Sequence, residues 1–139
     1  MLQVHEKLYL GNALEAREPR QLYDLAIEAV VDVAFEESPA SLPRDFIYCR
    51  LPLLDGEGNS TASLRSAFEI TRALIGQRKK TLVSCSAGLS RSPTLACYVL
   101  SDLEAKSPEE VLASIASVKG LDIKPSLWTD FRRLFEGPS

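Results

Sequence analysis

The chain has 139 residues, of which 45% are hydrophobic and 25% charged, and its formal net charge is −3. These values suit one soluble globular domain over 1–139 that needs no disulfide or metal, and the lack of a basic block argues against nucleic acid as the main partner. No stretch approaches the roughly 18 apolar residues of a membrane span and residues 1–7 show no signal-peptide pattern, so we expect a cytoplasmic protein with no membrane partner.

Strand and helix patterns alternate along the first half of the chain. Short apolar runs favour strands, whereas apolar residues at helical spacing favour helices. By these criteria the expected elements are a strand over 4–10, a helix over 19–28, and strands over 29–34 and 46–54. A loop with two glycines, Asp55–Asn59, follows the last of these strands.

The second half continues the alternation. The expected elements are a helix from Ser60 or Thr61, a strand over 81–84, and helices that begin near Ser92, Ser107 and Pro125. Ser107 and Glu110 match a capping box, which marks a helix N-terminus. The whole pattern predicts an α/β fold, with a central, mostly parallel sheet of four to five strands flanked by helices.

The segment Cys85–Ser92, Cys-Ser-Ala-Gly-Leu-Ser-Arg-Ser, lies between an apolar strand and an apolar helix. A loop that opens a helix directs N–H groups and the positive helix dipole at one point, where phosphate oxygens bind. Gly88 gives the backbone freedom to curl, and Arg91 is suited to bind two phosphate oxygens. These groups favour the thiolate form of Cys85. The sulfur would attack phosphorus, and Ser92 would donate a hydrogen bond to it.

A buried structural cysteine beside a glycine turn is the alternative interpretation of this segment. The composition predicts such a pattern by chance in roughly one to two of every thousand chains of this kind. The flanking strand and helix lower that frequency further. We therefore favour the phosphate-binding interpretation.

Residues 83–94 resemble the signature of the dual-specificity phosphatases, within the cysteine-based protein-tyrosine-phosphatase superfamily. Segments 8–12, 30–34 and 123–134 are similar to the opening strand, second core strand and closing helix of that family. The resemblance implies hydrolysis of phosphomonoesters through a phosphocysteine, without a metal or other cofactor. It also implies that the phosphate is held by Ser86, Ala87, Gly88, Leu89, Ser90 and Arg91. One departure is Ser84, because the family usually has histidine before the nucleophile.

Asp55 is the expected general acid, although by its residue pattern alone an ordinary turn aspartate is the better interpretation. If the strands that end at Leu54 and Ser84 are parallel, Asp55 and Cys85 share one edge of the sheet. The family's acid lies about thirty residues before its cysteine, and the same spacing separates these two residues. Glu57 is the second choice.

The expected partner is a phosphorylated protein substrate. The loop interior, 86–90, contains no lysine or arginine, which favours phosphotyrosine proteins, with phosphoserine and phosphothreonine as a second option. The alternative function is a pseudophosphatase that binds phosphoproteins without turnover, for which Ser84 is a weak argument. Low-molecular-weight phosphatases and arsenate reductases carry a similar loop near the N-terminus and fit poorly. The sequence does not predict an oligomeric state.

The three cysteines are too widely spaced for a disulfide framework or a zinc site. Cys49 and Cys97 are expected in the core, and Cys49 is also a candidate disulfide partner for an oxidised Cys85. Glu36 and Glu37 follow a strand end, where an exposed loop is favoured over a border of the pocket.

Overall fold

The computed structural model describes residues 1–136, so the last three residues of the expected domain, 137–139, lie outside the described part. A five-stranded sheet forms its centre, in the order β1-β2-β5-β3-β4. The strands are β1 (Leu2–His5), β2 (Leu8–Gly11), β3 (Ala29–Ala34), β4 (Ile47–Leu53) and β5 (Thr81–Ser84). All neighbouring pairs are parallel except β1 with β2. The expected α/β fold with a mostly parallel sheet is confirmed.

Two predicted elements near the N-terminus differ from the structure. The single strand over 4–10 is wrong, because the chain reverses at Glu6 and Lys7 and forms the antiparallel pair β1 and β2. His5 Nδ1 accepts a hydrogen bond from the N–H of Lys7 (3.0 Å), which stabilises this turn. The predicted helix over 19–28 ends earlier, at Asp24, because Ala26 adopts a left-handed backbone conformation with φ of 58°.

The helices begin largely where capping residues predict them. They are the short 3₁₀ helix η1 (Glu15–Arg17) and the α-helices α1 (Pro19–Asp24), α2 (Thr61–Gly76), α3 (Arg91–Glu104), α4 (Pro108–Ala116) and α5 (Pro125–Arg133). Ser60 caps α2 by accepting from the N–H of Ser63. The predicted capping box of Ser107 and Glu110 is present at α4. Each such cap stabilises a helix by about 1 kcal/mol.

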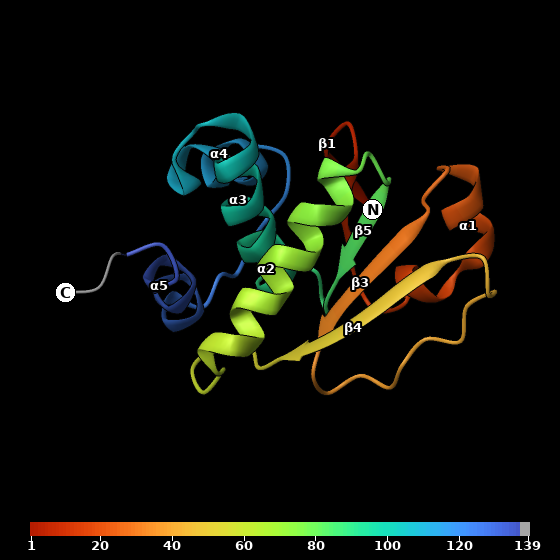
Figure 1. The fold of residues 1–139 in the computed structure, drawn as a ribbon, viewed down its shortest axis with the longest axis horizontal. Coiled ribbons are helices and arrows are strands. Elements are labelled where there is room, and N and C mark those ends of the chain that lie inside the picture. Colours follow the sequence, from red (N-terminus) through yellow and green to blue (C-terminus); the bar gives the residue numbers. More distant parts are fainter. Residues whose placement is uncertain (137–139) are drawn as a thin grey trace.

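Helices cover both faces of the sheet (Figure 1): α2 to α5 lie on one side, and η1 with α1 on the other. Side chains of β3 alternate between the two faces, so that Val31 and Val33 join the larger core while Val30 joins the smaller one. Helix α3 is buried along its first three turns, from Arg91 to Leu100. Its apolar burial, worth about 1.5–3 kcal/mol for each large side chain, fixes the start of α3 relative to the sheet.

Among residues 1–136, no helix combines the length and the apolar character that crossing a membrane would require.

Candidate active site

The loops after β3, β4 and β5 meet at one edge of the sheet, because the carboxyl ends of parallel strands point the same way. A pocket of about 190 Å³ opens there. Its lining residues are Glu36, Asp55, Cys85, Ser86, Ala87, Leu89, Ser90, Arg91 and Asp122. A larger hollow of about 410 Å³, near Tyr98 and Arg132, lies among the helices and contains no cysteine. The structure thus brings Cys85, Arg91 and Asp55 together.

The loop 86–91 is a nest of free amides. Among the described residues, no protein atom accepts a hydrogen bond from its N–H groups. Its carbonyls are held from outside, since that of Ser86 accepts from Ala13 N–H (3.2 Å) and that of Leu89 from Asp122 N–H (2.9 Å). Unpaired N–H groups at the start of α3 form an anion-binding site.

Gly88 makes this curl possible. Its φ is 74°, and a Cβ on this residue would lie 3.1 Å from the backbone of Gly11. Both the left-handed conformation and the close approach require glycine. A side chain at position 88 would therefore disturb the curl of the loop.

Cys85 lies at the base of the pocket and is only 2% exposed. Its Sγ is 3.3 Å from Oγ of Ser92, which is fully buried in the first turn of α3. The N–H of Cys85 donates to the carbonyl of Gly11 (3.3 Å), which ties the end of β5 to β2. Ser92 is therefore in position to donate a hydrogen bond to the sulfur.

Arg91 is 3% exposed and forms a two-pronged ion pair with Glu36. Nη1 and Nη2 donate to the two oxygens of Glu36 (2.6 and 2.7 Å), and Nη1 also donates to the carbonyl of Leu53 (2.8 Å). These three bonds use three of the five guanidinium hydrogens. The two hydrogens left, on Nε and Nη2, share one edge, and such an edge binds two phosphate oxygens.

The interpretation of Glu36 and Glu37 as a plain exposed loop is wrong for Glu36, which borders the pocket although its side chain is 53% exposed, whereas Glu37 does not line the pocket. Hydrogen bonds from Arg91 lower the pKa of Glu36 to about 2, against its ordinary value of 4.5. Burial would lower the pKa of Arg91, but the hydrogen bonds and charge of Glu36 outweigh it and the pKa rises. The pair therefore stays ionised throughout the neutral range.

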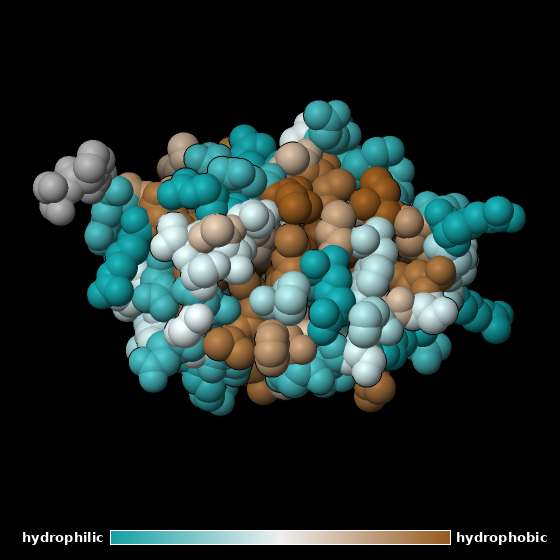
Figure 2. All heavy atoms as spheres, turned by 60° about the horizontal axis from the view of Figure 1, so that its bottom comes forward, coloured by the Kyte–Doolittle hydropathy of each residue, from teal (hydrophilic) through white to brown (hydrophobic). Residues whose placement is uncertain are grey.

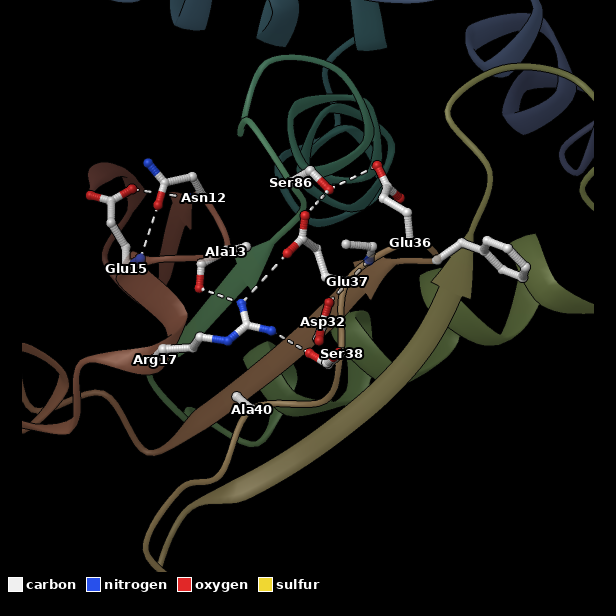
Figure 3. Close-up of polar contacts among 12 residues, drawn as sticks. Asn12, Ala13, Glu15, Arg17, Asp32, Glu36, Glu37, Ser38, Ala40 and Ser86 are labelled. Carbon is white, nitrogen blue, oxygen red and sulfur yellow. Dashed lines mark hydrogen bonds and ion pairs between the residues drawn. The ribbon is translucent and has the colours of Figure 1, made fainter.

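Further contacts hold the loop after β3, which carries Glu36 and Glu37, in place (Figure 3). Ser86 Oγ lies 2.8 Å from Glu36 Oε2 and 3.0 Å from Glu37 Oε2, and Arg17 bonds to the carbonyls of Ala13 and Ser38. Nη2 of Arg50, on β4, donates to the carbonyls of Phe35 (3.2 Å) and Glu37 (2.7 Å) in this loop. The carboxylate of Glu36 is therefore held both by the anchored backbone of its own loop and by its ion pair with Arg91.

Replacing Glu36 by glutamine is expected to lower kcat/KM for a phosphomonoester by about 10- to 100-fold, because a misdirected guanidinium loses the productive geometry. Acid stability should also respond. The depressed pKa means that the Glu36 contact stabilises the fold above about pH 4.5 and that this contribution disappears as the pH falls toward 2. The difference in melting temperature between wild type and Glu36→Gln should therefore be smaller at pH 3 than at pH 7.

The matched control is Glu28→Gln, at the opposite end of β3, where the carboxylate pairs with exposed Lys79 (3.7 Å). This variant should keep wild-type kcat/KM. Equal activity of Glu36→Gln and Glu28→Gln would contradict a positioning role for Glu36.

Asp55 is exposed on the β4–α2 loop and borders the pocket. Asn59 closes this loop, because its side chain accepts from Leu54 N–H (2.8 Å) and donates to the Leu54 carbonyl (2.9 Å). Gly56 and Gly58 both have positive φ values, so the loop needs residues without Cβ. Glu57 does not line the pocket.

The other sulfur atoms lie away from the pocket lining. Cys97 is fully buried in α3, and burial raises its pKa to about 12, so it is an unreactive thiol of the core as expected. Cys49 packs against the same core from β4, and it is a free thiol, as are Cys85 and Cys97. The hydroxyl of Ser84 is buried without a hydrogen-bond partner among the described residues. Within residues 1–136 no cluster of His, Cys, Asp and Glu suits a metal ion.

The fold and the cysteine–arginine loop are those of the protein-tyrosine-phosphatase superfamily. The family pattern described as "Dual specificity phosphatase, catalytic domain" matches residues 8–126. The chain therefore belongs to the dual-specificity phosphatase family, and the resemblance seen in its sequence is confirmed.

Individual relatives are similar but not close. "Dual specificity protein phosphatase 15" of mouse is 29% identical over 116 residues, and that of rat 30%. This covers 83% of the chain but 48% of each relative, so the chain spans about half of their length. The crystal structure of human DUSP28 superimposes with a TM-score of 0.85 at 20% identity, covering 96% of this chain and 94% of that one. That of DUSP15 gives 0.83 at 24%, covering 96% and 85%.

Proposed function

We propose that residues 1–139 form a single catalytic domain that dephosphorylates phosphotyrosine in proteins, with phosphoserine and phosphothreonine as further substrates. One observation carries this proposal: the sulfur of Cys85, the free amides of 86–91 and the open edge of Arg91 border the same small pocket. A phosphate bound by those amides and that guanidinium would present its phosphorus to the sulfur.

In the first step the Cys85 thiolate attacks phosphorus. The S–P bond forms while the bond from phosphorus to the substrate oxygen breaks, and protonated Asp55 gives its proton to that oxygen. The amides and Arg91 stabilise the charge on the equatorial oxygens, which is the largest contribution expected in such a site.

In the second step water hydrolyses the phosphocysteine. The carboxylate of Asp55 takes a proton from water as the water oxygen attacks phosphorus, and the P–S bond breaks. Ser92, 3.3 Å from the sulfur, donates a hydrogen bond to the departing thiolate. Inorganic phosphate leaves, and the protonated acid is restored.

Asp55→Asn is expected to lower kcat by about 10²- to 10⁴-fold for alkyl and aryl phosphates, because an alkoxide or aryloxide leaves poorly without a proton. The loss should be larger for an alkyl phosphate than for an aryl phosphate, because an alkoxide is the poorer leaving group. Asp45→Asn, at the opposite end of β4, is the matched control. A wild-type kcat in Asp55→Asn for both kinds of ester would assign the acid to another group.

The test of the proposed function is hydrolysis of an aryl phosphate between pH 4.5 and 8, in the presence of a metal chelator, with and without vanadate. A vanadate-sensitive, bell-shaped activity supports the proposal. Binding of phosphate or a phosphotyrosine peptide without turnover would instead establish a phosphoprotein-binding pseudophosphatase. The same measurement with phosphoserine and phosphotyrosine peptides ranks the substrates.

A further inference from the structure

The mouth of the pocket is rich in acidic side chains. Each of three surrounding loops contributes one carboxylate to the lining: Glu36 after β3, Asp55 after β4 and Asp122 before α5. We call these three residues the acidic rim. Among residues 1–136, Arg91 is the only basic side chain that lines the pocket.

Arg91 does not neutralise the negative charge that substrate groups other than the phosphate would meet at the acidic rim. Its side chain is 4% exposed, and Glu36 already pairs with it through both carboxylate oxygens. Lys119 approaches Gly88 but does not line the pocket. A substrate side chain next to the phosphorylated residue would therefore meet the charge of Asp122, because Asp55 carries the proton that it donates in the first step.

Asp122 is the carboxylate of the rim best placed for recognition. Its N–H donates to the carbonyl of Leu89 (2.9 Å), and the next turn is fixed by the bond from Lys124 N–H to Ser90 Oγ (3.1 Å). The carboxylate itself is 74% exposed, and its pair with Lys124 Nζ (3.3 Å) is exposed too. Exposed ion pairs are weak, so a substrate cation can replace Lys124.

Apolar side chains flank the rim on the side of β3 and β4. Phe35 is 57% and Leu54 39% exposed, and each precedes a rim carboxylate in the chain. The strand ends that carry them are joined by the bond from Phe35 N–H to the Leu53 carbonyl (3.2 Å). Figure 2, which brings this edge of the sheet forward, shows hydrophobic side chains interspersed with hydrophilic ones in the middle of the face and mostly hydrophilic ones toward both ends.

We infer that the substrate is a phosphorylated polypeptide with lysine or arginine beside the phosphorylated residue, and that acidic or multiply phosphorylated segments are poor substrates. This inference rests on the proposed function of the same pocket. The phosphate binds the loop amides and Arg91. The neighbouring lysine or arginine side chains bind Asp122 of the acidic rim. Their aliphatic stems pack on Phe35 and Leu54.

The experiment compares two phosphotyrosine peptides of equal length, one with lysine and one with glutamate at the positions flanking the tyrosine. At low ionic strength kcat/KM should favour the lysine peptide by about 3- to 10-fold, as expected for a few exposed charge pairs. The preference should shrink in about 0.5 M salt, where the screening length is only a few ångströms.

Asp122→Lys is the decisive variant, because it reverses one charge of the acidic rim and leaves every residue of the cysteine loop unchanged. The ratio between the two peptides should fall at least about 3-fold. The matched control is Asp24→Lys, the same charge reversal on the exposed end of α1, far from the carboxyl ends of the strands. It should leave the ratio unchanged.

The result that would overturn the inference is a wild-type preference for the glutamate peptide, or a ratio that Asp122→Lys does not change. Failure of the proposed function is separate: it would appear as no hydrolysis of the aryl phosphate by wild type. In that case the same two peptides are compared by binding affinity, and the acidic rim predicts tighter binding of the lysine peptide.

Discussion

Cys85→Ser is expected to abolish turnover of every phosphomonoester, with kcat lower by at least roughly 10⁴-fold, since loss of a catalytic nucleophile has effects of this size or larger. A serine hydroxyl is a far weaker nucleophile than a thiolate, and the structure offers it no histidine base, because the chain's single histidine, His5, lies in β1. Phosphate binding should persist, because the amides of 86–91 and Arg91 are unchanged. The measurement is kcat on an aryl phosphate together with phosphotyrosine-peptide affinity.

The control for this prediction is Cys49→Ser, which alters a free thiol on β4 outside the pocket lining. It should retain activity. Turnover by Cys85→Ser at even a few per cent of the wild-type rate would show that another group attacks phosphorus, and the two-step mechanism would have to be abandoned.

Arg91→Lys is expected to lower kcat/KM by about 10²- to 10⁴-fold, although the positive charge is kept. One ammonium cannot replace a planar fork that binds Glu36 with one edge and phosphate with another. Loss of a transition-state contact of this kind costs about 10²- to 10³-fold in comparable sites. Glu36, left without its two-pronged partner, adds to the effect. Kinetics on an aryl phosphate and phosphate inhibition constants measure both contributions.

Arg72→Lys is the matched control, because Arg72 forms an exposed pair with Asp102 (2.8 Å) on the helical side. Its activity should equal that of wild type. The fold of Arg91→Lys is checked by its melting temperature. If a folded Arg91→Lys variant retains more than about a tenth of the activity, the guanidinium edge does not bind the phosphate as proposed.

Contacts to the cysteine loop bear on the departure at Ser84, the last residue of β5. Family members usually carry histidine at the position of Ser84, where this chain has a buried hydroxyl without a described partner. In this structure the loop is ordered from other directions, through Ala13 on Ser86 and Asp122 on Leu89. The loop that carries Glu36 is held by bonds from Arg17 to the Ser38 carbonyl and from Arg50 to the Glu37 carbonyl, and through Glu36 it also orients Arg91. We expect these contacts to supply the order that the histidine provides elsewhere.

The sequence by itself determined those structural features that depend on residues close together in the chain. The order of strands and helices, the capping box at Ser107 and the spacing of Cys85, Gly88 and Arg91 were all predictable, because each acts through local backbone geometry. The mostly parallel sheet followed from alternating apolar patterns. Where local signals failed, as at Glu6 and Lys7, a short polar turn was too weak a signal to divide one apolar run into two strands.

Only the tertiary structure decided which distant groups meet Arg91. Glu36 is 55 residues away from it in the chain, and the Leu53 carbonyl 38. They reach the guanidinium because β3 lies between β4 and β5, so that three strand ends converge on one pocket. Asp122, on the segment before α5, reaches the rim through the bond from its N–H to the Leu89 carbonyl. Strand order depends on long-range packing, which no window of the sequence contains, and for that reason the acidic partner of the arginine was not predictable from its own surroundings.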